Sequence, residues 1–290
     1  IGLNALGDVN HASTVRNIAI GSGSGDGMGG IQGANADNIF IGYDAGGGTW
    51  GTAVSYKNIA IGNYAMDAAM NEAERNTAVG YAALGDVTTA DDNVAIGYEA
   101  GHDITTGSSN VFIGREAGDK TTDVDSAIII GHGAGGADMT NDADGTISIG
   151  YGAGAALTSG EGNVAIGYQA MDANQTSDYN VAIGQAALGA VNGNGTGGNV
   201  AVGYGAGTAI TDGVLNVAIG TSALASNQQS NKNIAIGYAA SYNVTADTDG
   251  QSVVIGHEAS FYNATGVNNT CVGYHAGMGA SGQNNSNNTA

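Results

Sequence analysis

The stretch that decides the fold is Asn93-Val94-Ala95-Ile96-Gly97-Tyr98-Glu99-Ala100, and close copies of it stand at 163–170, 180–187 and 199–206. Its glycine recurs at sixteen positions, separated by 18 to 21 residues early in the chain and by 17 or 19 later. These positions are 2, 21, 42, 62, 80, 97, 114, 131, 150, 167, 184, 203, 220, 237, 256 and 273. Such a period predicts a repeat protein in which each unit stacks on its neighbours.

Within each repeat, large apolar residues stand three and one positions before the glycine, with a small residue between them, as in Val94, Ala95 and Ile96. Alternation with a period of two predicts a strand. A strand of about five residues with a return of about a dozen cannot bury its own apolar face, so we expect each strand to lie beside its copy in the next coil. The sequence therefore predicts an all-β parallel β-solenoid of about sixteen coils of 17–21 residues. We expect the apolar residue before the glycine to form the core: Ile96, Ile113, Ile130, Ile149, Ile166, Ile183, Ile219, Ile236 and Ile255.

Two other residues recur at fixed positions of the repeat, and each recurrence has a physical explanation. Asn opens most strands, as at Asn93 and Asn110, and is expected to turn the chain in the left-handed conformation and to hydrogen-bond to the next coil. The glycine after the strand tolerates a positive φ and a close backbone approach. The chain contains no proline, as expected where every strand N–H must donate.

The repeat continues over residues 1–290 as a single solenoid, with looser coils at 1–79 and regular coils at 80–290, where spacings of 17, 17 and 19 alternate. Both ends cut through a repeat. We therefore expect the chain to be a window of a longer fibre.

Units of the form Asn-x-Ala-Ile-Gly-x-x-Ala resemble the head repeats of trimeric autotransporter adhesins, and still more the repeats of bacteriophage tail fibres. The resemblance covers almost the full length. It implies a left-handed β-roll, a homotrimer, and a place on the cell exterior or the virion surface. The repeats here are longer than those of adhesin heads, and neither a coiled-coil stalk nor a chaperone-protease domain is present.

Composition excludes several classes of function. The chain has 6 Lys+Arg against 26 Asp+Glu, a net charge of −20, which is incompatible with binding nucleic-acid phosphates. No run of apolar residues approaches the 18 or so needed to span a membrane. A single cysteine excludes an intrachain disulfide. No nucleophile, base and carboxylate stand in a catalytic pattern, so we expect no catalytic residue and no enzyme activity.

Tyrosine directly follows the glycine in eight repeats and is expected to form an aromatic column: Tyr43, Tyr81, Tyr98, Tyr151, Tyr168, Tyr204, Tyr238 and Tyr274. The column could stack on the sugar rings of a surface glycan, or form a seam of stacked rings within or between chains. His132 and His257 stand in the same column and are expected to be ladder members, whereas His102 and His275 are expected to be ordinary surface residues.

Acidic residues gather in the returns. Asp142 and Asp144, and again Asp247 and Asp249, form D-x-D-G turns that offer oxygen ligands for Ca²⁺. The alternative is that they are solvated turn carboxylates, because no downstream Glu completes a calcium loop. Apart from this calcium, no cofactor is expected.

The favoured function is a structural and adhesive fibre shaft, which associates with itself and touches a cell-surface glycan. The alternatives are a tailspike-type polysaccharide depolymerase, for which the short returns offer no obvious groove, and a calcium-stabilised, ligand-binding solenoid.

Overall fold

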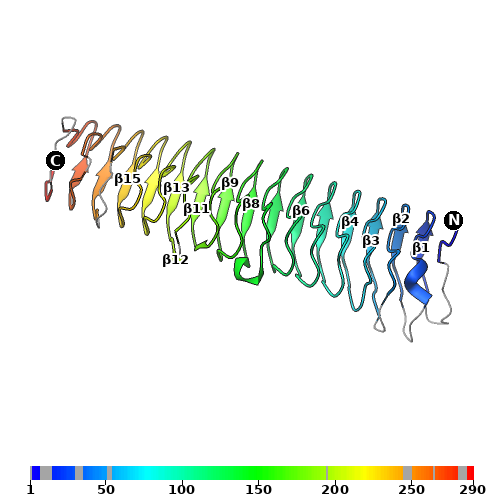
Figure 1. Ribbon diagram of the computed structural model, residues 1–290. Coiled ribbons are helices and arrows are strands. Elements are labelled where there is room, and N and C mark those ends of the chain that lie inside the picture. The colour runs from blue at the N-terminus through cyan, green and yellow to red at the C-terminus, as the bar shows by residue number, and fades with distance from the viewer. Residues whose placement is uncertain are drawn as a thin grey trace. The chain divides into compact units, whose positions relative to one another are not determined.

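The computed structural model describes residues 2–6, 15–29, 35–50, 54–193, 195–243, 250–263, 265–279 and 286–290 (Figure 1). Nearly all regular elements among these residues are strands of two or three residues. The helical elements among them are two short 3-10 turns, η1 (Asp26–Gly29) and η2 (Asn141–Ala143). The chain is an all-β parallel β-solenoid, as the repeat predicted.

Two compact units divide the chain at Gly145: Ile1–Gly145 and Thr146–Ala290. The first contains β1 (Ile18–Ile20), β2 (Ile39–Ile41), β3 (Ile59–Ile61), β4 (Thr77–Val79), β5 (Val94–Ile96), β6 (Val111–Ile113) and β7 (Ile128–Ile130). The second contains β8 (Ile147–Ile149), β9 (Val164–Ile166), β10 (Ser177–Asp178), β11 (Val181–Ile183), β12 (Gly195–Thr196), β13 (Val200–Val202), β14 (Val217–Ile219), β15 (Ile234–Ile236), β16 (Val253–Ile255) and β17 (Thr270–Val272).

Within each unit, successive main strands pair in parallel and in register, so equivalent residues of neighbouring coils lie in columns (Figure 1). Ile96 of β5, for example, pairs with Val79 of β4 and with Ile113 of β6. The short strands β10 and β12 form a separate pair in the second unit. A residue's place in the repeat therefore decides which residues lie above and below it.

The inside of each coil holds the central residue of the strand, most often Ala, and not the apolar residues on either side of it. Ala95 is 0% exposed, whereas Ile96 beside it is 42% exposed. The prediction that the Ile column forms the core is therefore wrong for the single chain, because none of its nine members is buried: Ile96, Ile113, Ile130, Ile149, Ile166, Ile183, Ile219, Ile236 and Ile255. A coil of about 17 residues encloses so little space that the strand can contribute only one side chain to it.

Bulkier core side chains come from the return of the coil. Leu84 and Val87, four and seven residues after their glycine, are both completely buried. Where Phe112 replaces the central Ala, glycine replaces the Leu: a Cβ at Gly101 or Gly118 would lie 2.6 or 2.5 Å from the Phe112 ring. A larger residue on the strand is thus accompanied by a smaller residue on the return, so that the interior stays filled without overpacking.

The two sequence columns at the ends of the strand have distinct roles. The corner glycines have φ between +125° and +147°, and a Cβ at Gly97 would lie 2.3 Å from the carbonyl oxygen of Gly114. The predicted Asn ladder is present: the backbone N–H of Asn110 donates to Oδ1 of Asn93 over 2.9 Å. The left-handed conformation, which was predicted for the Asn, belongs instead to the residue before it, such as Asp92 with φ +59°. This is because the buried side-chain amide of the Asn must point along the stack of coils.

Candidate functional site

The outer face of the sheet is an uncharged apolar surface. Its two columns contain the first and last residues of the main strands, all Ile or Val except Thr77 and Thr270. None of these residues is buried among those the structure describes, and several are between 37% and 49% exposed. An apolar face that repeats at every coil within each unit of a highly acidic chain is typical of an interaction surface. We refer to it as the outer apolar face.

Tyrosine side chains form stacks beside this face. The rings of Tyr81 and Tyr98 lie 5.3 Å apart and those of Tyr151 and Tyr168 5.2 Å apart, both nearly parallel. In such stacks the faces of the rings cover one another, which leaves the edges and hydroxyls at the surface. Tyr64, which sequence analysis missed because it stands one residue later in its repeat, joins the column by edge contacts with Tyr43 and Tyr81.

Tyr204 differs from the other members of the column. The equivalent residues of the neighbouring coils are Gln185 and Thr221, because β13 pairs with β11 and β14 in register. The Tyr204 side chain is 58% exposed and, within the described chain, has no aromatic stacking partner. Its ring faces are therefore less covered by neighbouring rings than those of the stacked tyrosines.

The structure describes one of the two predicted Asp turns, which contains Asp142 and Asp144. Asp142 is exposed in η2, and Oδ1 of Asp144 accepts a 2.7 Å hydrogen bond from the backbone N–H of Asp125 in the preceding coil. Neither belongs to either of the two clusters of three or more His and carboxylate groups found among the described residues. Asp247 and Asp249 lie outside the described residues.

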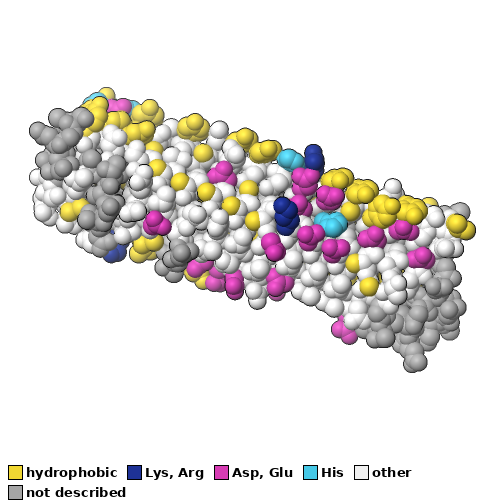
Figure 2. Space-filling view, viewed as in Figure 1, with side chains coloured by type: hydrophobic (Ala, Val, Ile, Leu, Met, Phe, Trp, Pro, Cys, Tyr) yellow, Lys and Arg dark blue, Asp and Glu magenta, His cyan; other side chains and the backbone are white. Residues whose placement is uncertain are grey.

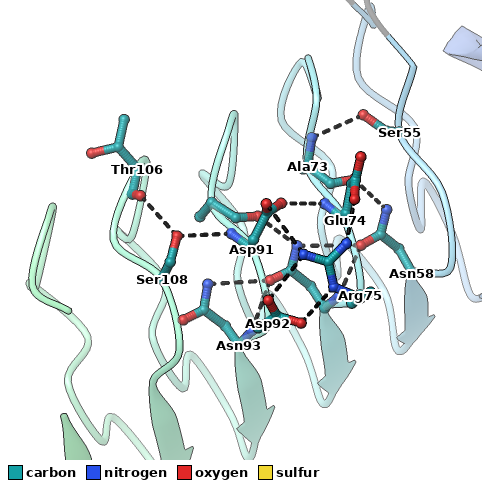
Figure 3. Close-up of polar contacts among 12 residues, drawn as sticks. Ser55, Asn58, Ala73, Glu74, Arg75, Asp91, Asp92, Asn93, Thr106 and Ser108 are labelled. Carbon is teal, nitrogen blue, oxygen red and sulfur yellow. Dashed lines mark hydrogen bonds and ion pairs between the residues drawn. The ribbon is translucent and has the colours of Figure 1, made fainter. Parts of the chain in front are cut away.

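A network of carboxylates surrounds Arg75 at the ends of neighbouring returns (Figure 3). The guanidinium pairs with Glu74 of its own coil and with Asp92 of the next, where Nε lies 2.6 Å from Oδ1. The backbone N–H of Glu74 also donates to Asp91 over 2.7 Å, while Ser108 accepts a hydrogen bond from the N–H of Asp91. The hydrogen bond from Arg75 lowers the pKa of Asp92. These contacts join three coils, so we assign the network a structural role.

One histidine of the first unit sits among acidic groups. Nδ1 of His102 lies 2.5 Å from Oδ1 of Asp103, and Asp86 of the preceding coil completes the cluster. Burial opposes the charged imidazole, but the hydrogen bond to Asp103 and the charges of both carboxylates outweigh it and raise the pKa of His102. This histidine, predicted to be an ordinary surface residue, is thus part of a charged cluster.

On the visible face, Asp and Glu side chains are more frequent than Lys and Arg (Figure 2). A shallow hollow beside the Arg75 network is lined by Val54, Glu72, Glu74, Thr89 and Asp91. None of the helical turns in the described ranges is long and apolar enough to cross a membrane.

Comparison with known proteins adds no assignment: no protein-family model matches the chain, and no curated protein matches it.

Proposed function

We propose that this chain is the shaft of an extracellular or virion-surface fibre, in which three copies associate through the outer apolar face. The observation that carries the proposal is the pair of uncharged Ile and Val columns on the outside of the sheet. A chain of net charge −20 repels its own copies, so association needs a face that is apolar and free of charge. The outer apolar face meets both conditions.

The arrangement of the copies follows from the repeat. When equivalent strands of parallel copies face one another, each residue of a column meets the same residue of another chain, and the fibre axis coincides with the stacking direction. Burying the exposed 42% of Ile96 contributes about 0.6–1.3 kcal/mol per chain, and the contribution repeats at every coil. The number three comes from the resemblance of the repeats to those of trimeric adhesin heads.

A cysteine cross-link tests this arrangement. In a Cys271→Ala background, Ile96→Cys places a thiol on the outer apolar face, and Thr106→Cys places one on an exposed return as the control. Under mild oxidation we expect covalent dimers from Ile96→Cys and single chains from Thr106→Cys. Equal cross-linking of the two variants, or none from Ile96→Cys, contradicts the proposed interface.

The proposal includes no enzyme activity, and the Arg75 network supports this because it joins neighbouring coils. A polysaccharide depolymerase would need two carboxylates about 5–10 Å apart across a substrate groove. Incubation with a panel of capsule polysaccharides tests this alternative, and release of reducing ends would overturn the assignment.

Glycan contact is the second candidate function, and the exposed ring of Tyr204 favours it. A sugar ring stacks on an aromatic face, which Tyr204 leaves free and which the stacked Tyr81 and Tyr98 cover. On a glycan array, Tyr204→Ala should weaken binding, whereas Tyr81→Ala should leave it unchanged. Binding that survives Tyr204→Ala excludes the Tyr204 ring as the glycan site.

A further inference from the structure

Two histidines and a glutamate meet at neighbouring corners of the second unit. His257 and Glu258 follow β16, and His275 follows β17, which pairs with β16 in register. The backbone N–H of His275 donates to the carbonyl oxygen of His257 over 3.0 Å, which fixes the two corners against each other. The period of the repeat thus places side chains 17 residues apart on the same small area of surface.

The ligand atoms of the three side chains converge. Nε2 of His275 lies 2.8 Å from Oε2 of Glu258, and Nδ1 of His257 lies 4.0 Å from the same oxygen. One nitrogen or oxygen from each residue lies within 4.8 Å of the others. Nε2 of His275 is buried, yet in the described part of the chain it has no partner with hydrogen-bond geometry, although it is close to Glu258. Two imidazole nitrogens and a carboxylate oxygen this close together form a donor set that suits one cation.

We propose that His257, Glu258 and His275 form a binding site for one divalent transition-metal ion of the zinc class. Imidazole nitrogen with one carboxylate suits Zn²⁺, Co²⁺ or Ni²⁺, whereas Ca²⁺ takes oxygen ligands alone. Metal–ligand bonds of about 2.0–2.2 Å place neighbouring ligand atoms about 2.9–3.6 Å apart. The distance of 4.0 Å to His257 therefore closes with a sub-ångström movement of an exposed side chain.

The aromatic column holds the two rings in place. His257 stacks between Tyr238 at 4.9 Å and Tyr274 at 5.4 Å, and His275 stacks on Tyr274 at 3.8 Å. Restricting the rings lowers the ordering cost of ligation. The exposed side of His257 leaves the remaining coordination positions to water, and the bound ion joins the coil of β16 to the coil of β17.

The chain contains matched controls for this site. His132 occupies the same column as His257, and its Nε2 lies 3.7 Å from Glu116, but the residue that corresponds to His275 in that coil is Gly133. This pair lacks the second imidazole. The cluster of Asp86, His102 and Asp103 has one imidazole, and His102→Gln removes this ligand so that the cluster does not compete for the metal.

The experiment uses the full chain carrying His102→Gln, from which metal has been removed with chelator. This chain is titrated with Co²⁺ while the visible absorption is recorded. The titration is then repeated with Zn²⁺ by calorimetry. We expect one ion per chain, a loss of affinity of at least about tenfold in His275→Gln and in Glu258→Gln, and no change in His132→Gln. Saturating Zn²⁺ should also raise the unfolding temperature of the parent chain but not that of His275→Gln. Circular dichroism verifies that each variant is folded, and Glu258→Gln replaces His275→Gln if the latter is not.

Three results would overturn the site. The first is no uptake by the parent chain up to about 1 mM Co²⁺. The second is equal affinity in the parent, His275→Gln and Glu258→Gln. The third is a loss of binding in His132→Gln that matches the loss in the other variants.

Discussion

Aspartate placed at two neighbouring residues of β5 should have opposite consequences. Ala95 is completely buried between Ala78 and Phe112 of the adjacent coils, whereas Ile96 lies on the outer apolar face between Val79 and Ile113. The same substitution therefore introduces a carboxylate into the interior in one variant and onto the surface in the other.

The two substitutions differ in cost because only Ala95→Asp buries its carboxylate. Ala95→Asp leaves an unpaired charge in the interior, at about 3–5 kcal/mol, and overpacks a filled column, at about 1–3 kcal/mol more. Ile96→Asp keeps its carboxylate in water and loses the buried part of the Ile side chain, about 1–2 kcal/mol, with up to about 1 kcal/mol of strand propensity. Ala95→Asp should thus be the more destabilising by roughly 1–7 kcal/mol.

Urea titrations followed by far-ultraviolet circular dichroism measure the two free energies of unfolding, and light scattering measures the mass of each chain. We expect Ile96→Asp to unfold cooperatively and to have lost association with other copies. We expect Ala95→Asp to be unfolded or close to it. A folded Ala95→Asp together with an unfolded Ile96→Asp would show that the two faces of the strand have been assigned the wrong way round.

Three other predictions follow from the packing, the ladder and the charges. Gly118→Leu should destabilise the chain by about 1–3 kcal/mol, because its side chain meets the Phe112 ring, and adding Phe112→Ala should restore part of the loss in a thermal melt. Asn93→Ala removes hydrogen bonds to Asn76, Gly107 and Asn110 and should cost about 2–4 kcal/mol in urea titration; a cost below about 0.5 kcal/mol would contradict the ladder. Desolvation raises the pKa values of Asp67 and Asp119, so their protonated forms favour folding. This contribution is complete below about pH 4 and is lost as the pH rises through the folded-state values, so the melting temperature should increase as the pH falls from 7 towards 4, and a decrease over that range would contradict it.

The period of the sequence was enough to predict the strands, their parallel register and the Asn ladder. Those features depend only on which residues recur, and recurrence is visible in the sequence. Alternation in Val94, Ala95 and Ile96 shows that a strand has two faces but does not show which face is inside. The thinness of the coil decides that question, since the completely buried Leu84 and Val87 of the return also occupy the interior.

The proposed metal site was missed for a related reason. His275 stands outside the tyrosine column, but it stands in the same column as Glu258, and stacking brings these two side chains to 2.8 Å. Comparing residues 17 positions apart, column by column, would have found the pair. The aromatic stack sets the rotamers of His257 and His275, and these rotamers direct both rings toward Glu258. The spacing of residues in the sequence does not predict them.

The central claim is that copies of this solenoid associate through the uncharged outer apolar face, and the solution mass tests it most directly. Light scattering at neutral pH, in buffer and then in chelator, should give three times the single-chain mass of 28.4 kDa in both conditions. A stable single chain in buffer would contradict the proposed fibre, and dissociation in chelator alone would show that a metal ion, rather than the outer apolar face, holds the copies together.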